Sequence, residues 1–411
     1  MKIFSHLRRI CAHRAAPSSL LAAALTALAA APVAAQFVPT EVRVSPHRGL
    51  VDYEISQQRA KIAWTDPKGD MWLADVNRDT GAFEPAHGRG QLLAQNTVAN
   101  WNMFMWNGPE WVATASGDQI FYSFYVDGMP KIANNTRMGM AVMSSTGEWV
   151  ARALSPDVPR MAHVASTNPR DKNPMIRYLD PNLNQYWRYL KSPKSEEMLT
   201  MVPASNKSWR FANGVRAFLY TEAVEGVPQV FAYMLDDRVS VQLTTDNGAK
   251  DLYRTVPWVW PAPEFDGDLV LSTVVDGSEL RIYRRMIGAD GVARWTPVYS
   301  ATLPEGRLAG SPEWFVYKGK SYVFMVAYTS SGLEYPTEIW LSNIDAADPL
   351  LRKITVDEPY RARNDPEVFI TTQGGPYIYY NRYDPSIDPD HPLCADCSEG
   401  VFRADAGLLG R

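Results

Sequence analysis

The most informative chemical feature of this chain is a short phrase in which proline is followed by glutamate and then an aromatic or branched residue. If the phrase marks a repeated structural unit, its glutamates lie at one repeat position and meet in space. Crowded carboxylates repel each other, which raises the pKa of at least one and suits it to donate a proton while another stays ionised. The phrase occurs at Pro109-Glu110-Trp111, Pro263-Glu264-Phe265, Pro312-Glu313-Trp314 and Pro366-Glu367-Val368.

Other polar residues fall at or beside the same position. Weaker copies of the phrase place His47, Arg170 and Arg210 there, and Asp365 stands just before the last proline. We expect the acid and base roles to belong to Glu264, Glu313, Glu367 and Asp365. We expect substrate contacts from His47, Glu110, Arg170 and Arg210.

Such a group of side chains has several uses. Two carboxyl groups can divide the roles of acid and base in glycoside cleavage. Carboxylate oxygens can instead hold a divalent cation, so a structural Ca²⁺ is one prediction. Arginine and histidine beside tyrosine can bind a uronate and remove its C5 proton, as a polysaccharide lyase would with His47 or His163. A purely structural alternative is a glutamate that bonds the backbone of the next unit.

Aromatic residues are the second chemical signal, with 13 tryptophans and 20 tyrosines. Flat rings stack on the faces of sugars, and their N–H and O–H groups suit a wet cleft. Trp258 and Trp260 would share one face of a strand, and Glu264 follows closely. We therefore predict that this pair contacts substrate, with packing between structural units as the alternative.

The elements that would position these residues are short strands. Runs rich in Val, Ile, Tyr, Phe and Trp alternate with Gly, Asp, Asn and Pro clusters, which is typical of an all-β protein. The clear phrases recur about every 50 residues with several strands per unit, which predicts a β-propeller. We predict seven four-stranded antiparallel blades, with six and five as alternatives. Strand-like segments at 41–44 and 401–404 would pair to close the ring.

The N-terminal region resembles an export signal. Basic residues precede an apolar run at 20–31, and small residues at 33–35 precede Gln36. We predict a signal peptide at 1–35, a single propeller domain at 36–411, and a secreted or periplasmic mature protein. A retained membrane anchor is the alternative, although the run is shorter than the roughly 20 residues that span a bilayer. No later stretch is long and apolar enough to cross a membrane.

The net charge of the chain limits its binding partners, and its cysteines indicate a disulfide. The chain of 411 residues has a formal net charge of −4, which argues against nucleic acid. After the predicted cleavage, Cys394 and Cys397 are the cysteines that remain, and an oxidising compartment favours a disulfide between them. Asp390 and His391 nearby make a metal site the weaker alternative.

The repeated sequence pattern resembles that of exported TolB-type and WD-repeat-like propellers. Each repeat has a proline and aromatic start, a glycine-bearing turn and strands that end in Ile-Tyr-like pairs. The usual Trp-Ser-Pro-Asp-Gly core is absent. The segments 311–328 (SPEWFVYKGKSYVFMVAY) and 364–381 (NDPEVFITTQGGPYIYYN) are also similar to strand pairs of family 43 glycoside hydrolases. That resemblance implies an acidic trio at the inner ends of the blades, although the family's own acid-bearing phrase is missing.

Together these patterns predict a monomeric, exported propeller that binds carbohydrate at an acidic, aromatic-lined axial funnel, with glycoside hydrolysis as the first candidate reaction. A non-catalytic TolB-like propeller that docks an envelope protein is the first alternative. A polysaccharide lyase is the second.

Overall fold

The computed structural model describes residues 37–48, 50–84, 90–98, 108–155, 157–165, 174–199, 209–210, 217–245, 256–329 and 337–409. The predicted signal peptide and Arg170 lie outside these ranges. Contacts divide the chain into the units Met1–Phe37 and Val38–Arg411, and the description below concerns the second unit.

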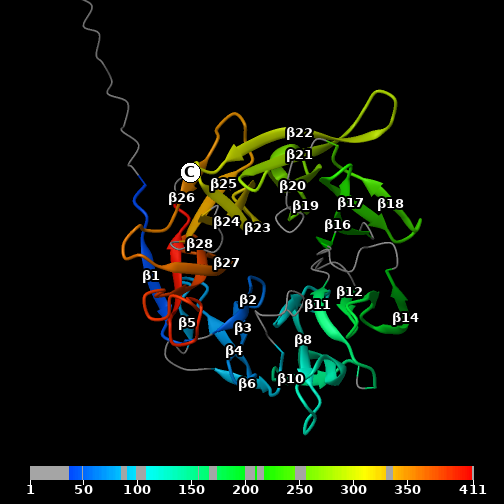
Figure 1. Ribbon diagram of the computed structural model, residues 1–411, viewed down its shortest axis with the longest axis vertical. Coiled ribbons are helices and arrows are strands. Elements are labelled where there is room, and N and C mark those ends of the chain that lie inside the picture. The colour runs from blue at the N-terminus through cyan, green and yellow to red at the C-terminus, as the bar shows by residue number, and fades with distance from the viewer. Residues whose placement is uncertain are drawn as a thin grey trace, which may run out of the picture. The chain divides into compact units, whose positions relative to one another are not determined.

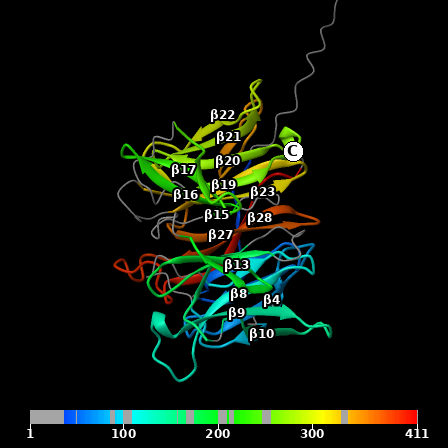
Figure 2. The same ribbon diagram turned by 90° about the vertical axis from the view of Figure 1, so that its right-hand side faces the viewer.

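Seven antiparallel sheets form the blades of a ring (Figure 1), and Figure 2 shows the same blades from the side. Blade 1 contains β2 (Val51–Ser56), β3 (Lys61–Thr65), β4 (Met71–Val76), β5 (Phe83–Glu84) and β6 (Gln91–Ala94). Blade 2 contains β7 (Glu110–Val112), β8 (Gln119–Tyr125), β9 (Thr136–Met143) and β10 (Trp149–Ala153), with the 3-10 helix η1 (Ala133–Asn135) before β9. Blade 3 contains β11 (Met161–Ala165), β12 (Met175–Leu179), β13 (Gln185–Tyr189) and β14 (Ser192–Met198).

The remaining blades follow the same order. Blade 4 contains β15 (Trp209–Arg210), β16 (Ala217–Val224), β17 (Val227–Met234) and β18 (Val239–Gln242). Blade 5 contains β19 (Trp258–Pro261), η2 (Pro263–Phe265), β20 (Leu269–Val275), β21 (Glu279–Ile287) and β22 (Ala293–Thr302). Blade 6 contains β23 (Arg307–Tyr317), β24 (Lys320–Thr329), β25 (Glu338–Asn343) and β26 (Leu351–Lys353). Blade 7 contains β27 (Ala362–Thr371), β28 (Gly375–Tyr383), β29 (Ser398–Asp405) and β1 (Glu41–Ser45).

The all-β, seven-bladed propeller predicted from the sequence is therefore confirmed. The middle strands are mostly apolar and buried on both faces, as in β20 (LVLSTVV), where six of the seven residues are buried. The outermost strand β18 (VSVQ) is exposed along its whole length. Within the described ranges, no helix has the length and apolar character of a membrane span.

The hydrophobic core lies between the blades. One cluster joins Trp260 and Ile282 of blade 5 to Val323 and Met325 of blade 6. Another joins blade 1 to blade 7, where Phe83 stacks on Tyr379 with ring centroids 5.6 Å apart. Each sheet therefore buries its faces against its neighbours, so the stability of a blade depends on the blades beside it.

The ring closes as predicted, because the first strand completes the last blade. β1 pairs antiparallel with β29, with Glu41 opposite Ala404 and Val42 opposite Arg403. In Figure 1 this blue strand runs beside the red strands of blade 7. The closure joins the N-terminal strand to the last blade through backbone pairing.

Candidate functional site

Three innermost strands, β2, β23 and β27, share a β-bulge. In each strand the pairing register shifts, and one residue adopts a left-handed backbone conformation. These residues are Asp52 (φ 49°), Ser311 (φ 43°) and Asp365 (φ 58°). A bulge adds an unpaired residue and turns the following side chains toward a new direction, and bulges are common beside functional sites. Two residues after each bulge stand Glu54, Glu313 and Glu367.

The residue between bulge and glutamate explains the proline phrase. Pro312 and Pro366 fill this position in β23 and β27. Proline is tolerated there because the strand pairing is interrupted at the bulge and needs no backbone N–H donor. In β2 the position holds Tyr53, whose N–H donates a hydrogen bond to Asp365 Oδ2 at 3.3 Å. The bulge of blade 7 is thereby bonded to the bulge of blade 1.

Blades 1 and 2 are tied together at the same level. The backbone N–H of Gly108 donates a hydrogen bond to Asp52 Oδ2, and Trp111 Nε1 donates to the backbone oxygen of Glu54 at 3.1 Å. A Cβ atom at position 108 would approach Asp52 to 2.8 Å, so the close contact requires glycine. Glu110 follows two residues after Gly108, at the start of β7.

Six acidic side chains from the adjacent blades 6, 7, 1 and 2 act on one another electrostatically. We call this group the carboxylate cluster. Glu367 is 8 % exposed, and the other five side chains are half-buried. The members are Asp52, Glu54, Glu110, Glu313, Asp365 and Glu367.

Burial and mutual repulsion give three cluster members unusual acidities. Burial raises the pKa of Glu54 well above its ordinary value, and repulsion from Glu367 and Glu110 raises it further. Burial, followed by repulsion from Asp52 and Glu313, likewise raises the pKa of Asp365. The pKa of Glu367 is raised by burial and then by Glu313 and Asp365. The cluster therefore holds protons at a pH where isolated carboxyl groups are ionised.

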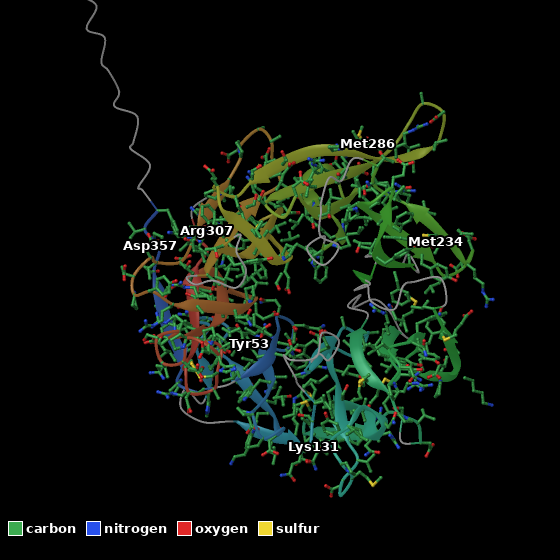
Figure 3. The ribbon with its side chains drawn as sticks, in the orientation of Figure 1. Tyr53, Lys131, Met234, Met286, Arg307 and Asp357 are labelled. Carbon is green, nitrogen blue, oxygen red and sulfur yellow. A yellow bond between two sulfur atoms is a disulfide. The ribbon has the colours of Figure 1, made fainter. Side chains whose placement is uncertain are left out.

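Tyr53 lies on the inner side of the ring in Figure 3, and its side chain belongs to the hydrophobic core between blades 1 and 7. Its side chain is 0 % exposed, and its hydroxyl has no hydrogen-bond partner among the described residues. Burial raises the pKa of this phenol, and the carboxylates of Asp365 and Glu367 are the charges that raise it most. A buried hydroxyl without a partner is rare in native proteins and calls for an explanation.

Four of the predicted site residues thus come together, namely Glu110, Glu313, Asp365 and Glu367. Glu264 does not join them, which corrects its predicted repeat position. Pro263, Glu264 and Phe265 form η2, after the innermost strand β19, because the chain turns there instead of bulging. Glu264 accepts hydrogen bonds from the N–H and Oγ of Ser321 in blade 6, both at 2.8 Å. It therefore has the structural role given above as the alternative.

The prediction that Trp258 and Trp260 contact substrate is corrected for Trp260 in particular. Trp260 is 0 % exposed, stacks on Trp314 with centroids 5.1 Å apart, and donates from Nε1 to Ser321 Oγ at 3.0 Å. Trp258 packs against the hydrophobic core that blades 5 and 6 share, and its Nε1 donates to the backbone oxygen of Pro312 at 2.6 Å. Both rings join blade 5 to blade 6, so Trp260 has no face left for a sugar.

His47 is also placed differently from its prediction. It lies between β1 and β2, with its ring 6.2 Å from that of Trp64, and its buried Nε2 has no partner among the described residues. The repeat position of blade 1 belongs to Asp52-Tyr53-Glu54. Tyrosine in place of proline hid this copy, although its Asp-x-Glu pattern matches Asp365-Pro366-Glu367.

The other predicted contacts lie partly or wholly outside the described residues. Arg210 belongs to β15, where only the backbone is described, and the same holds for His163 in β11. Arg170 lies outside the described ranges altogether. Their roles stay predictions.

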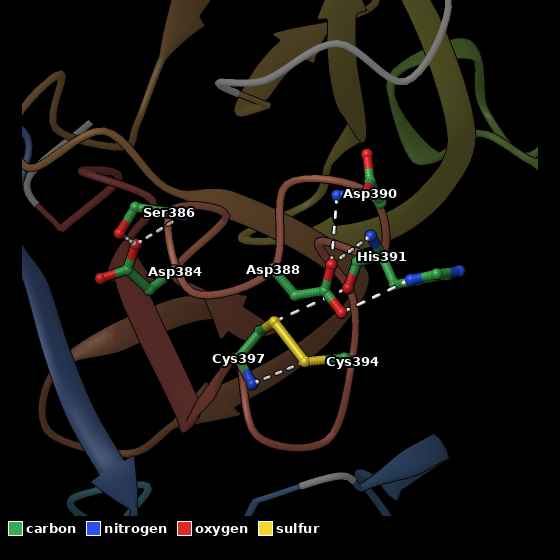
Figure 4. The surroundings of a disulfide bond; sticks show 7 residues. All are labelled: Asp384, Ser386, Asp388, Asp390, His391, Cys394 and Cys397. Atoms are coloured by element: carbon green, nitrogen blue, oxygen red, sulfur yellow. Dashed lines mark hydrogen bonds and ion pairs between the residues drawn. A yellow bond between two sulfur atoms is a disulfide. The ribbon is translucent and has the colours of Figure 1, made fainter.

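Cys394 and Cys397 form the predicted disulfide in the loop between β28 and β29, with Cα atoms 5.1 Å apart (Figure 4). Close by, Nδ1 of His391 lies 3.4 Å from Oδ2 of Asp388. In the part of the chain that the structure describes, no three His, Cys, Asp or Glu residues are arranged to hold a metal ion. The structural Ca²⁺ stays a prediction without an assigned site.

Comparison with solved structures supports the fold. The chain is similar to the propeller domain of Cps50 (Swd1) from Myceliophteria thermophila, with a TM-score of 0.53, 10% identity, and coverage of 89% of this chain and 98% of that one. It is also similar to an oligogalacturonate lyase from Vibrio parahaemolyticus, with a TM-score of 0.52, 9% identity, and coverage of 91% and 97%. A putative TolB from Agrobacterium tumefaciens matches with a TM-score of 0.37, 15% identity, and coverage of 60% and 79%.

At the level of sequence, no protein-family model matches the chain, and neither does a curated protein. The TM-scores of 0.53 and 0.52 come with identities of 10% and 9%, which establish a shared architecture and leave the activity open. The β-propeller fold that the sequence resemblance implies is supported by the similarity to the Cps50 (Swd1) propeller domain.

Proposed function

We propose that this chain is an exported propeller that binds a carbohydrate at the carboxylate cluster and hydrolyses a glycosidic bond there. The observation that carries the proposal is the convergence of six acids from four blades, three of them with a raised pKa. Glycoside hydrolysis needs one carboxyl group that keeps its proton and a second that is ionised. A cluster of mutually repelling acids supplies both states at the same pH.

Glu367 fits the role of general acid best. It is the most buried cluster member, and its pKa is raised by burial and by Glu313. Protonated Glu367 would give its proton to the glycosidic oxygen as the bond to the anomeric carbon breaks. Ionised Glu313 would attack that carbon or take a proton from the attacking water, according to the separation of the two groups in the complex. Asp365 would position Tyr53 through the hydrogen bond described above.

The cluster argues against the polysaccharide lyase among the alternatives. A lyase of that kind binds a uronate, whose carboxylate would be repelled by the ionised members of the cluster. We therefore propose a neutral or cationic glycan. The lyase neighbour in the comparison supports the architecture alone.

The general-acid role is tested with Glu367→Gln, which keeps the shape of the side chain and removes its proton. On a glycan that the wild-type protein cleaves, we expect a loss of about 10²- to 10⁴-fold in kcat. On the matching 2,4-dinitrophenyl glycoside, whose leaving group needs no proton, the variant should keep most of its bond-cleaving rate. Release of reducing ends and of dinitrophenolate are the two measurements.

Glu305→Gln is the matched control, because Glu305 is exposed in the turn between β22 and β23 and shortly precedes the strand that carries Glu313. This variant should cleave both substrates like the wild-type protein. Equal losses on the two substrates would remove Glu367 from the acid role. A wild-type protein inactive on a broad panel of neutral and amino glycans would overturn the hydrolase and leave the docking alternative.

Export is a separate part of the proposal and rests on the leader-like pattern at 1–35. When the full chain is made in a bacterium with a general secretion pathway, we expect the mature protein to begin at Gln36. N-terminal sequencing of the periplasmic fraction measures this. A cytoplasmic product that retains Met1 would contradict export without bearing on the hydrolase.

A further inference from the structure

The hairpin of β21 and β22 is the most extended outer part of the described blades. β22 has 10 residues, whereas the outermost strands β10, β14, β18 and β26 have 5, 7, 4 and 3. In Figure 1 the loop that connects β21 to β22 projects outward from the ring, and Figure 3 shows Met286 on the outer rim. The hairpin belongs to blade 5, which contributes no member to the carboxylate cluster.

One edge of β21 is open near the end of this hairpin. On one side, β21 pairs with β22 as far as Ile287, which lies opposite Ala293. On the other side, its pairing with β20 ends at Arg284, which lies opposite Val270. The chain before β20 turns away through η2, so in the described part of the chain residues 285–287 have a strand partner on one side only. An open strand edge of this kind is a template for a further strand.

A groove lies along the open edge. Its volume is about 300 Å³. Beside it, a Cβ atom at Gly267 would meet nothing beyond its chain neighbours within 4 Å, so the space next to this turn is free. The three edge residues span roughly 10 Å, which is the length of three residues of an extended peptide. The groove is lined by Asp268, Leu269, Arg284, Arg285, Met286 and Ile287.

The side chains around the open edge are apolar and basic. Met286 and Ile287 are 46 % and 69 % exposed, and as consecutive strand residues they lie on opposite faces of the sheet. Arg284 is neutralised by Asp268, at 2.6 Å from Nη2 to Oδ2. Arg285 is exposed, shares a face with Ile287, and forms no ion pair with the described residues. The edge therefore offers one apolar contact on each face and one positive charge that has no counter-ion.

The base of the hairpin is fixed to the ring. Trp295 lies opposite Arg285 and packs against the hydrophobic core that blades 4 and 5 share. On the other face, the guanidinium of Arg284 lies 4.8 Å from the ring centre of Phe265 in η2. The groove is thus held in shape before any ligand arrives, which lowers the entropic cost of binding.

We propose that this groove binds an extended peptide segment of a partner protein, which adds a strand beside β21. The backbone of the segment pairs with residues 285–287. Its side chains are apolar where they meet Met286 and Ile287 and acidic where they meet Arg285. A strand fits better than a lipid surface, because an open strand edge presents a line of backbone donors and acceptors that lipid tails cannot use. Peptide binding here does not depend on the carboxylate cluster, since the groove is built by blade 5 alone.

The probe is a fluorescein-labelled hexapeptide, Thr-Ile-Val-Glu-Val-Thr, whose binding to the mature protein is followed by fluorescence anisotropy. When it runs antiparallel to β21, its isoleucine, first valine and glutamate lie opposite Ile287, Met286 and Arg285. We expect a Kd below about 1 mM, and at least about tenfold weaker binding when lysine replaces the glutamate. N-methylation of the isoleucine and glutamate removes backbone donors and should weaken binding by at least about tenfold.

Arg285→Glu should reverse the preference, so that the lysine peptide binds more tightly than the glutamate peptide. Arg152→Glu is the matched control, because Arg152 is an exposed arginine in β10, the outermost strand of blade 2. This variant should keep the wild-type preference. Both arginines are exposed, so the fold is maintained, and a melting curve checks this.

Hydrogen exchange locates the bound peptide. Backbone amides within 285–287 should exchange more slowly when the peptide is bound, while those of β10 should not change. The proposal is overturned by equal binding of the three peptides, by no binding at about 1 mM, or by protection elsewhere without protection at 285–287.

Two other occupants of the hairpin are tested with the same variants. Flotation with vesicles of phosphatidylglycerol and phosphatidylethanolamine that is lost in Arg285→Glu would overturn the peptide and assign the hairpin to a membrane surface. Dimerisation of the wild-type protein in sedimentation equilibrium that is lost in Arg285→Glu would overturn it in favour of a second copy of this chain. We expect neither.

Discussion

Strand β27 of blade 7 contributes to two groups of charged side chains with opposite surroundings. At the closure of the ring, Glu41 of β1 lies between Arg363 and Arg382, at 2.5 Å and 2.9 Å. Arg382 also contacts Glu399 at 2.6 Å. Two residues after Arg363 on the same strand, Asp365 enters the carboxylate cluster, where its strongest charged neighbours are acids.

The contrast separates charges that hold the ring together from charges that destabilise it. A buried ion pair offsets most of the cost of removing two charges from water, and it fixes the strands that carry it. A group of buried like charges has no such compensation and raises the free energy of the folded state. Three left-handed bulge residues at the same place add backbone strain, which is typical of functional sites.

The largest change in the free energy of unfolding is expected where β1 closes the ring. Glu41→Ala would leave Arg363 buried without its carboxylate, and we expect a loss of about 3–5 kcal/mol in the free energy of unfolding. Denaturant unfolding followed by tryptophan fluorescence measures this. A loss no larger than that of a surface acid would show that the Glu41 pair contributes little to closing the ring.

In the carboxylate cluster, removing a charge is expected to stabilise the folded state instead of destabilising it. An acid with a raised pKa in the folded state holds its proton more tightly there than in the unfolded chain. Its contribution to stability is complete below its ordinary pKa of about 4.3 and is lost as the pH rises through the raised value. The wild-type protein should therefore lose stability as the pH rises above that ordinary value.

Glu367→Gln should flatten this dependence, because it removes one titrating group. We expect the variant to be more stable than the wild-type protein at pH 8, by about 1.4 kcal/mol for each pH unit by which folding raises the pKa of Glu367, and to be no more stable at pH 4. Melting temperatures across the pH range measure the difference. A variant less stable than the wild-type protein at pH 8 would show that Glu367 holds the fold together instead of straining it.

The smallest effect is expected for an exposed ion pair. Asp290 accepts from Arg294 at 2.6 Å in the hairpin of blade 5, but both side chains are more than half exposed. Water screens such a pair, so Asp290→Asn should leave the melting temperature unchanged. This variant is the control for Glu41→Ala, and a loss as large as that of Glu41→Ala would remove burial as the explanation.

Much of the fold follows from the sequence, because it depends on local patterns. Strand-forming runs such as 269–275 and turn residues such as Asp276-Gly277 repeat at a spacing that a propeller requires. Ring closure was predicted from strand-like segments at both ends, which β1 and β29 confirm. These inferences need only the chain's own periodicity.

The site was predicted in part, because its geometry depends on register between strands. The proline phrase identified Glu110, Glu313 and Glu367, but the same phrase at Pro263-Glu264 begins a 3-10 helix. Whether a proline marks a bulge or a turn is decided by the pairing of its neighbours, which the phrase does not encode. Asp52 and Glu54 were missed because Tyr53 replaces the proline.

The closing strand has a consequence for the order in which this protein folds. During synthesis β1 emerges from the ribosome long before β29, its pairing partner, about 360 residues later. The closed ring therefore cannot form until almost the whole chain has been translated. Until then Glu41 lacks both arginine partners, Arg363 and Arg382, because they lie more than 300 residues further along the chain.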